Sequence, residues 1–249
     1  MKKSSIKRGI AAFDIHYPLH DKPSMRILIK FIKDFKPDYL VLGGDQLDMG
    51  SISFYNKNKP KLLENNRLKA DYNGFQKDIL DKIDSILKPS CEKYFMIGNH
   101  EYRVVRLIEC DTQYEGFIEL GSNLELSDYT IVPHNDFIKI GNMVFIHGIR
   151  YNAYFARYNL LDYNENVFCG HVHKLQMFTK CSPLDGTPKI GVGVPCLCDT
   201  NPQWKRGQPN DWVNGFLYWY QYEDGNFSFY TPIIVEGKCV INDKAYNGV

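Results

Sequence analysis

The sequence has no long hydrophobic run and almost no excess charge. None of its segments approaches the roughly 20 consecutive apolar residues that a membrane-spanning helix needs. Its net charge is +1, whereas proteins that bind nucleic acid through bulk electrostatics usually carry a marked basic excess. Internal repeats, low-complexity segments and linkers are also lacking. We therefore expect a globular protein that does not associate with membranes and that forms a single domain over residues 1–249.

Cysteines are few, and their spacing is irregular. The seven cysteines form an odd number that does not suit a disulfide framework, so we expect reduced thiols and a cytoplasmic protein. Cys196 and Cys198 are too close for a zinc knuckle and are interpreted as two thiols on one face of a strand. The chain starts with lysines, as export signals do, but Asp14 interrupts the apolar run too early for such a signal. We expect a strand there instead.

In the first half of the chain, short β-like runs alternate with amphipathic helical stretches. The strands are expected at residues 9–14, 38–45 and 93–99, and the helices at residues 24–35, 61–87 and 101–109. This alternation implies crossover connections and a largely parallel sheet, and therefore an α/β fold.

The second half of the chain has a different character. The Gly141-Asn142 pair predicts a β-hairpin over residues 137–148. The segments that follow are predicted to be a helix at residues 152–163 and strands at residues 166–173, 216–222 and 226–235. The last two strands are rich in aromatic residues. We expect this half to add a second, more antiparallel sheet stacked on the first.

Polar side chains stand at the ends of five predicted strands. These residues are Asp14 with His16, Asp45, Asn99, His147, and His171 with His173. Ligands bind beyond the carboxyl ends of the strands in open α/β sheets, so the seven side chains are predicted to meet at one site. Aspartate oxygens and neutral imidazoles are ligands of borderline divalent ions. Seven donors exceed the needs of one ion, and a shared carboxylate suits two.

Each of these short patterns would be weak alone. A single Asp or His at a strand end is mostly chance, and His147 by itself would be interpreted as a core histidine. Five of the seven histidines nevertheless fall at these strand ends, since His100 directly follows Asn99, and only His20 and His134 lie elsewhere. A shared metal site accounts for all of these positions at once, so it is favoured over an unrelated structural role for each residue.

In their order along the chain, these residues resemble the calcineurin-like metallophosphoesterases, whose pattern is D-x-H, G-D-x-x-D, G-N-H-[DE], a single H, and G-H-x-H. The matching blocks are Asp14-Ile15-His16, Gly44-Asp45-Gln46-Leu47-Asp48, Gly98-Asn99-His100-Glu101, His147 and Gly170-His171-Val172-His173. All five occur in order without substitution, over roughly residues 10–175. The chain also looks like the small members encoded by bacteriophages and bacteria, which for a phage protein would mean the host cytoplasm.

The resemblance implies a four-layer α/β/β/α sandwich of two mixed sheets flanked by helices. It assigns Asp14, His16, Asp45 and His173 to one ion, and Asp45, Asn99, His147 and His171 to the other, with Asp45 bridging. His100 would be the catalytic residue beside the scissile phosphate and would not bind metal. The two ions are expected to be divalent transition metals, Mn²⁺ first, with Fe, Zn and Ni as alternatives.

This resemblance implies the hydrolysis of phosphoesters by a metal-bridging hydroxide. His100 as general acid would add a factor of roughly 10²–10⁴. A phosphodiester of a nucleotide or nucleic acid is favoured as substrate, which includes nuclease activity. The alternatives are a phosphomonoesterase, a phosphoprotein phosphatase, or a non-catalytic binding protein with the same fold. Homo-oligomers remain open, because the aromatic strands near the C-terminus either cover the core or pair with a second subunit.

Several neighbouring residues have two interpretations. Asp48 and Glu101 are expected to orient a ligand histidine by accepting its other ring N–H, or else to be surface acids. Arg103 is a candidate for binding phosphate. Aromatic side chains that would either stack on a nucleobase or pack in the core are Tyr151, Tyr154, Phe155 and Tyr158. The same choice applies to Trp204, Lys205, Arg206 and Trp212, in a polar loop at residues 200–214.

Overall fold

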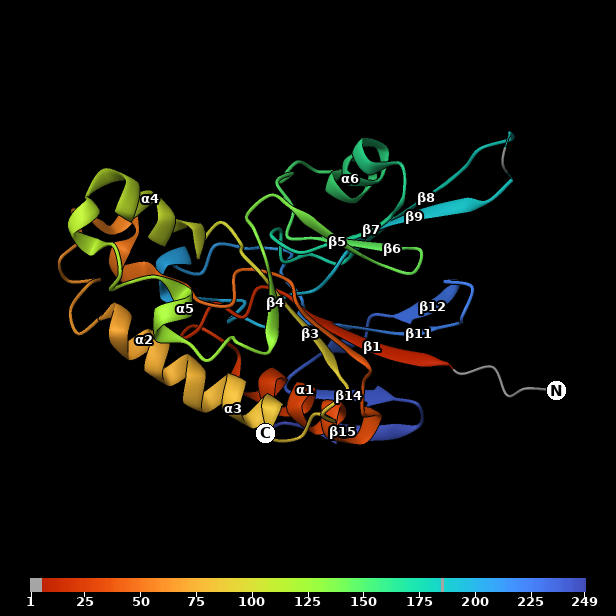
Figure 1. Cartoon of the computed structure of the whole chain (residues 1–249), viewed down its shortest axis with the longest axis horizontal. Helices are drawn as coiled ribbons and strands as arrows, with labels where there is room; N and C mark the ends of the chain where they lie inside the picture. The colour runs from red at the N-terminus through yellow and green to blue at the C-terminus, as the bar shows by residue number, and fades with distance from the viewer. Residues whose placement is uncertain (1–5, 185) are drawn as a thin grey trace.

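The computed structural model describes residues 6–184 and 186–249 (Figure 1). The lysines considered above as the start of an export signal fall within residues 1–5 and lie outside the described residues. In the described ranges, no helix combines the length and the apolar character needed to cross a membrane.

Six strands form the first sheet, in the order β12-β11-β1-β2-β3-β4 (Figure 1). Four of them are parallel to one another: β1 (Lys7–Ala12), β2 (Tyr39–Leu42), β3 (Glu92–Met96) and β4 (Tyr129–Val132). The strands β11 (Leu217–Gln221) and β12 (Phe227–Tyr230) continue the sheet antiparallel beyond β1. The parallel sheet expected from the first half of the chain is confirmed, although β4 was not predicted.

The placement predicted for the two aromatic strands was wrong. They were expected in the second sheet, but β11 pairs with β1 and β12 pairs with β11. Alternation of side chains predicts that a segment is a strand, but it does not say which strand becomes its partner. The indole of Trp219 packs between the sheets against Phe145, with the ring centroids 5.0 Å apart.

The second sheet has the order β5-β6-β7-β9-β8. The predicted hairpin is confirmed, with β5 (Phe137–Ile140) antiparallel to β6 (Met143–Ile146). The strands β7 (Asn166–Cys169) and β9 (Pro188–Gly193) run parallel to β6, and β8 (Gln176–Cys181) is antiparallel to β9. Small two-stranded sheets pair β10 (Asn214–Gly215) with β13 (Ile233–Ile234) and β14 (Lys238–Ile241) with β15 (Lys244–Asn247).

Helix α1 begins at a side-chain cap that the sequence provides. In α1 (Lys22–Phe35), the Asp21 side chain accepts a hydrogen bond from the Ser24 N–H and Pro23 occupies the first turn. The helix expected from residue 61 begins only at Leu68 and comprises α2 (Leu68–Phe75), the π-helical turn η3 (Gln76–Leu80) and α3 (Asp81–Asp84). The remaining α-helices are α4 (Tyr102–Cys110), α5 (Leu120–Asn123) and α6 (Phe155–Tyr163).

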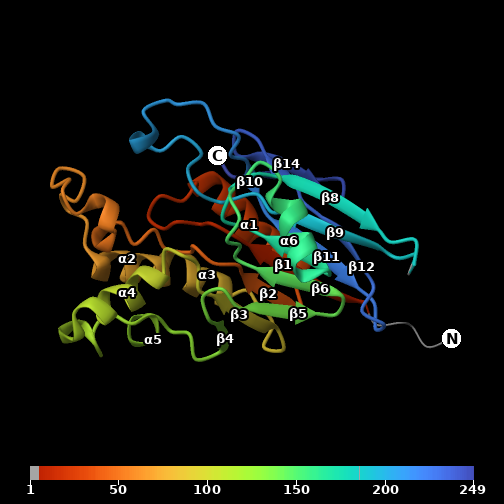
Figure 2. The ribbon, with the colours of Figure 1, turned by 90° about the horizontal axis from the view of Figure 1, so that it is seen from above.

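Strand β1 shows how the sequence produces the layers. Its alternate residues Ile10 and Ala12 pack in the cluster that contains the apolar faces of α1, α2 and α3. Ala11 instead packs in the cluster between the two sheets, with Phe145 and Phe168. Helix α6 covers the outer face of the second sheet through Phe155. Figure 1 shows α1 and α6 on opposite sides of the stacked sheets, and Figure 2, seen from above, shows α6 over the strands of the second sheet, so the four-layer α/β/β/α sandwich is confirmed.

Candidate metal centre

The loops that follow β1, β2, β3, β6 and β7 carry the seven side chains predicted as metal ligands. Because β1, β2 and β3 are parallel, their carboxyl ends lie at one edge of the first sheet. Strands β6 and β7 are parallel as well, and they bring their own ends to the same place. The structure brings the seven side chains together in two adjoining groups.

The first group contains Asp14, His16 and His173, all of them buried. The Nε2 atoms of the two histidines face each other at 3.1 Å. The Asp14 Oδ1 atom lies 3.5 Å from Nε2 of His173 and 3.9 Å from Nε2 of His16. Three ligand atoms from two loops, the one after β1 and the one after β7, therefore point at one spot.

The second group contains Asp45, Asn99, His147 and His171. The Asn99 Oδ1 atom lies 3.0 Å from Nε2 of His147 and 2.8 Å from Nδ1 of His171. The Asp45 Oδ2 atom lies 3.3 Å from Nε2 of His147. The other nitrogen of His147, Nδ1, is 3.1 Å from the carbonyl oxygen of Gly43. That contact places the ring proton on Nδ1 and leaves the lone pair of Nε2 directed at the group.

Asp45 lies between the two groups. Its Oδ2 atom is 3.7 Å from Nε2 of His16 as well as 3.3 Å from Nε2 of His147. Within the described residues, Asp14 Oδ1 is a fully buried carboxylate oxygen with no hydrogen-bond partner. Such an atom is costly unless a cation or a proton compensates it. The donor set and this unpartnered oxygen both fit divalent cations, one for each group, with Asp45 shared between them.

The backbone at the site adopts a conformation that most residues avoid. Asp14, His16, Asp45, His171 and His173 all have positive φ, between 52° and 70°. This left-handed conformation costs free energy in residues other than glycine, and residues that adopt it are concentrated at functional sites. Five of the seven ligand candidates share this strained backbone, which turns each side chain out of its strand end and toward the cluster.

Two glycines permit the close approach of the loops. A Cβ atom at position 98 would lie 2.2 Å from Asp45 Oδ1 and 2.3 Å from the Asp45 backbone nitrogen. A Cβ atom at position 170 would lie 2.5 Å from Asp14 Oδ2. All three distances are shorter than van der Waals contact allows, so Gly98 and Gly170 are required for the observed positions of the two aspartates.

The electrostatics of the cluster favour positive charge. Burial opposes ionisation of Asp45, but His147 and His100 outweigh it and hold the pKa of Asp45 well below its ordinary value. Burial lowers the pKa of His147, but the neighbouring Asp45 carboxylate more than compensates and raises that pKa to about 9. The pKa of His171 is lowered, first by burial and then by the charge of His147. The buried carboxylates attract protons or metal cations, which compete for the same histidines.

His100 lies beside the cluster, held by residues from two loops. Its Nδ1 is 2.7 Å from the carbonyl oxygen of Asp48, and its Nε2 is 3.0 Å from Nη2 of Arg103. The second Arg103 nitrogen, Nη1, donates to the same Asp48 carbonyl at 2.7 Å. Burial opposes protonation of His100, but the charge of Asp45 and the Asp48 carboxylate raise its pKa above the ordinary value.

Asp48 is placed between two imidazoles. Its Oδ1 atom is 3.5 Å from Nδ1 of His16 and 3.5 Å from Nδ1 of His100. The carboxylate therefore faces the nitrogen of His16 that is turned away from the first group. Arg103, a candidate for binding the substrate phosphate, contacts His100 and the Asp48 carbonyl, and its contact with phosphate stays a prediction.

Glu101 has a different place from the one predicted. It was expected to accept the N–H of a ligand histidine, but its fully buried carboxylate accepts backbone N–H groups from Asp45 at 3.0 Å, Leu47 at 2.8 Å and Gly98 at 2.9 Å. Burial and the charge of Asp45 raise the pKa of Glu101 to about 7. The side chain joins the loop after β2 to the loop after β3, a tertiary role that the local sequence motif does not reveal.

A pocket of about 200 Å³ opens above the cluster. Its floor contains ligand candidates and His100, and its wall contains Leu19, Cys198, Asp199, Pro202, Trp204 and Trp212. The edge of Trp212 meets His173, with the ring centroids 4.2 Å apart, and the Lys205 ammonium lies 3.7 Å from the centroid of Trp212. Arg206 lies in the same 200–214 loop but does not line the pocket.

The aromatic residues before β7 divide between the two predicted roles. Phe155 is buried and packs against the second sheet. Tyr154 and Tyr158 are exposed. Tyr151 is 82 % exposed, and its ring centroid lies 6.2 Å from that of His171. Of these residues, Tyr151 is therefore the one placed to contact a molecule bound at the cluster.

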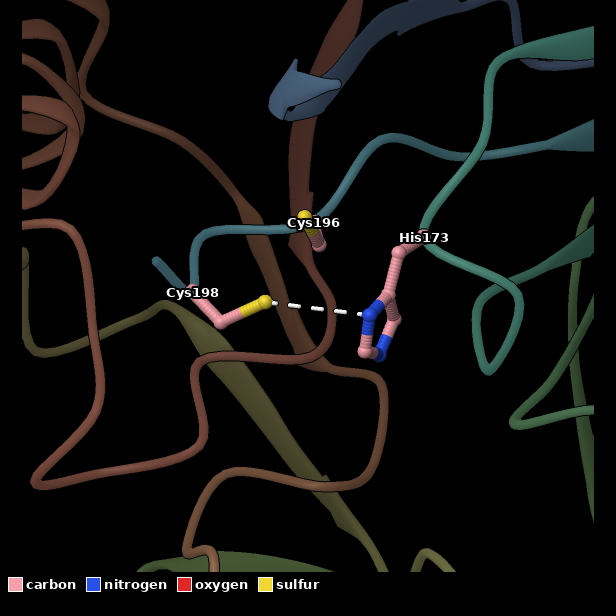
Figure 3. Close-up of side chains that lie close together, drawn as sticks. All are labelled: His173, Cys196 and Cys198. Atoms are coloured by element: carbon pink, nitrogen blue, oxygen red, sulfur yellow. Dashed lines mark hydrogen bonds between the residues drawn. The ribbon is translucent and has the colours of Figure 1, made fainter. Parts of the chain in front are cut away.

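Sequence reasoning missed the surroundings of His173. The thiols of Cys196 and Cys198 lie next to its ring, with Cys198 Sγ 3.8 Å from Nδ1 (Figure 3). The short C-x-C spacing was interpreted as two thiols of a strand. A contact between segments 25 residues apart leaves no local pattern that would have identified it.

Comparison with known proteins supports the fold. No protein-family profile matches the sequence, and no curated protein is significantly similar to it. Vacuolar Protein Sorting 29 from Cryptosporidium parvum is 14 % identical, with 97 % of this chain and 98 % of that chain covered and a TM-score of 0.50. A mutant of Vps29 from Entamoeba histolytica is 14 % identical, with 94 % and 97 % covered and a TM-score of 0.49. A protein of Streptococcus pneumoniae described as a predicted phosphoesterase is 9 % identical, with 92 % and 99 % covered and a TM-score of 0.34.

The chain shares the fold of the Cryptosporidium protein, which is the metallophosphoesterase fold. At 14 % identity the likeness to the Cryptosporidium protein extends to the fold alone. The chemistry of the site has to be argued from the side chains of this chain.

Proposed function

We propose that the protein is a metal-dependent phosphoesterase that hydrolyses a phosphodiester of a nucleotide. The observation that carries this proposal is the convergence of seven oxygen and nitrogen donors, five of which line an aromatic-walled pocket. Proposed ligands of one cation are Asp14, His16, Asp45 and His173, and those of the other are Asp45, Asn99, His147 and His171. Mn²⁺ is the first candidate, with Fe, Zn and Ni as alternatives, because oxygen and nitrogen donors suit all of these ions.

Two bound divalent cations would act as Lewis acids on the phosphoryl oxygens and would lower the pKa of a water molecule. The protein contributes the placement of these cations. Asp14 and Asp45 provide the negative charge, and the Nδ1–H of His147 on the Gly43 carbonyl keeps Nε2 available as a ligand. The buried Glu101 fixes the backbone of the loop that carries Asp45.

His100 is proposed as the general acid. Its Nε2 lies 3.8 Å from Asp45 Oδ2, so this nitrogen faces the cluster while Nδ1 is engaged by the Asp48 carbonyl. In the neutral ring, Nε2 accepts a hydrogen bond from Arg103. In the protonated ring, the same atom carries the proton that passes to the leaving ester oxygen. Without bound ions, burial opposes protonation of His100, but the charge of Asp45 and the Asp48 carboxylate outweigh it and raise the pKa of His100 above its ordinary value.

The pocket wall supports a nucleotide as the substrate. Trp204 is 56 % exposed, and its ring centroid lies 5.9 Å from that of Trp212, so the two rings present an aromatic surface beside His173. Bases stack on such surfaces, at roughly 1–3 kcal/mol for each base. The ionisable side chains lining the pocket are aspartates, histidines and Cys198, without Lys or Arg. The positive charge that attracts phosphate would then come from the cations, which favours a small diester over a long nucleic acid.

A non-catalytic binding protein is the second candidate. The Cryptosporidium protein is named for vacuolar protein sorting and has the same fold, so the fold alone does not establish catalysis. This chain keeps all seven donors and His100 within reach of one another, and that arrangement favours the enzyme.

A substrate panel tests the proposal. The chain is loaded with Mn²⁺ and assayed on bis-para-nitrophenyl phosphate, para-nitrophenyl phosphate, cyclic nucleotides, dinucleotides, phosphopeptides and labelled DNA and RNA. We expect turnover of the diesters, with nucleotide diesters ahead of the polymers, and its loss on chelation. Absence of turnover on every ester by a chain shown to contain two Mn²⁺ ions would favour the binding protein.

A further inference from the structure

His173 has a second face that the proposed function does not use. Its Nε2 points at Asp14 and His16, whereas its Nδ1 points at the thiols of Cys196 and Cys198 (Figure 3). Nδ1 and the two Sγ atoms all lie within 4.8 Å of one another, and the three residues are buried. One imidazole therefore stands between an oxygen-and-nitrogen group and a sulfur group.

The position of the two thiols is fixed by the backbone around them. The N–H of Leu197 donates to the carbonyl of Asp14 at 3.1 Å, so the C-x-C segment is tied to the end of β1. The N–H of Cys196 donates to the carbonyl of Val213 at 3.0 Å, and Val213 in turn donates to the carbonyl of His173 at 2.9 Å. A site whose ligands are held by its supporting backbone is preorganised for an ion.

The spacing of the ligand atoms suits a metal better than a hydrogen bond. With metal–sulfur and metal–nitrogen distances of about 2.3 Å and 2.0–2.1 Å, a tetrahedral ion separates S from N by roughly 3.5 Å. The separation of Cys198 Sγ and His173 Nδ1 is 3.8 Å, close to this value and long for a contact of a weak thiol donor. Cys198 also lines the pocket, which gives an ion a path from solvent and room for a water ligand.

We propose that Cys196 Sγ, Cys198 Sγ and His173 Nδ1 form a third metal position, for a thiophilic divalent cation such as Zn²⁺. The cation replaces the two thiol protons and the Nδ1 proton of His173, and these three protons pass to the solvent. The thiol of Cys196 then gives up its hydrogen bond to the Val213 carbonyl. The position shares His173 with the first group of donors, but its existence does not depend on phosphoesterase activity.

The softness of the ligands distinguishes this position from the other two. Thiolates select Zn²⁺ and Cu⁺, whereas carboxylates and carbonyl oxygens suit Mn²⁺. Cys169, another buried cysteine, lies 3.2 Å from the Asn159 amide nitrogen and is not part of any of the ligand groups within the described residues. The thiols of Cys196 and Cys198 are therefore expected to bind Zn²⁺ in preference to Mn²⁺.

X-ray absorption at the zinc edge tests the proposal. The full chain with the exposed thiols removed, Cys110→Ser and Cys181→Ser, is loaded with Zn²⁺, so that surface cysteines cannot capture the ion. We expect a sulfur shell at about 2.3 Å. Adding Cys196→Ser and Cys198→Ser removes that shell and one equivalent of zinc for each chain. A spectrum of the first chain with only nitrogen and oxygen neighbours overturns the proposal.

Cys91→Ser is the matched control, because Cys91 is buried in the helix-facing core and belongs to none of the ligand groups. It should keep the sulfur shell. The double serine variant is checked for folding by near-ultraviolet circular dichroism. If it fails to fold, the zinc-edge spectrum of the chain that keeps both thiols still tests the proposal. Failure here is distinct from failure of the proposed function, which shows instead as absent diester turnover by the Mn²⁺-loaded chain.

Discussion

At the scale of single residues, Asp45 is proposed to bind the metal ions and His100 to transfer a proton. Asp45 contacts both groups of donors, whereas His100 contacts the Asp48 carbonyl and Arg103. One residue is therefore expected to control the presence of the ions, and the other the rate of the reaction once they are present.

The variants Asp45→Asn and His100→Ala should behave differently. Asparagine tolerates the left-handed backbone at position 45 and keeps the side-chain shape, but it removes the charge shared by the two cations. We expect Asp45→Asn to fold but to bind Mn²⁺ at least about 100-fold more weakly, a larger loss than results from changing a residue that only contacts a ligand. Activity should be lost together with the metal. His100→Ala should retain Mn²⁺ and lose roughly 10²–10⁴ in turnover. Isothermal titration and diester assays check both; full turnover in His100→Ala would show that another group supplies the proton.

Asp71 provides a prediction about pH and stability. This residue of α2 is buried, its Oδ2 has no hydrogen-bond partner, and burial together with the charge of Asp48 raises its pKa from 3.8 to about 6. A carboxyl that is harder to ionise when folded favours the folded state at low pH and opposes it above the folded pKa. The stabilising effect of its protonation is therefore complete below about pH 4 and lost as the pH rises through about 6.

Asp71→Asn should stabilise the protein at pH 7. The change in pKa corresponds to at most about 3 kcal/mol, and screening by solvent reduces it, so we expect a gain of about 1–2 kcal/mol at pH 7. The gain should vanish near pH 4. Urea unfolding of the metal-free protein at both pH values measures it. Asp243→Asn, at an exposed position of the β14–β15 turn, is the control and should change neither value. A gain that is equal at both pH values would assign the effect to something other than ionisation.

At the scale of elements, Glu101 holds the site loops together. Its carboxylate accepts N–H groups from the loop after β2 and from the loop after β3. The amide of glutamine has one acceptor oxygen, so Glu101→Gln leaves at least one buried N–H unpaired. An unsatisfied buried group costs about 1–3 kcal/mol, and more where a charged acceptor is lost.

We therefore expect Glu101→Gln to lower the free energy of unfolding by about 2–4 kcal/mol and to weaken Mn²⁺ binding, although the residue is not a ligand. Glu109→Gln, on the exposed part of α4, is the control. Denaturant unfolding and titration with Mn²⁺ measure the two effects. Unchanged unfolding in Glu101→Gln would mean that the loops are held by other contacts.

The elements also show which features can be predicted from the sequence and which cannot. Strand ends with Asp, Asn and His are local features, and the parallel order of β1, β2 and β3 explains why their ends meet. The contacts of Glu101 and of the 196–198 thiols join distant segments, so no local pattern encodes them. The helix predicted from residue 61 begins only at Leu68, because Asn65 has a positive φ of 61° that a right-handed helix cannot include.

At the scale of the whole molecule, the two sheets bring five loops to one edge. The first sheet provides Asp14, Asp45 and Asn99, and the second provides His147 and His171. The core between the sheets includes Phe13, directly before Asp14, so packing at this interface fixes the relative position of the two donor sets. The aromatic strands β11 and β12 extend the first sheet, and a homo-oligomer stays a prediction.

The central claim is that loops from both sheets hold a pair of divalent cations. Anomalous diffraction from crystals of the protein grown with Mn²⁺ tests it most directly. We predict two manganese peaks, one at Asp14, His16 and His173 and the other at Asn99, His147 and His171, with the Asp45 carboxylate between them. Manganese peaks away from these side chains, or none in crystals grown with saturating Mn²⁺, would contradict the account.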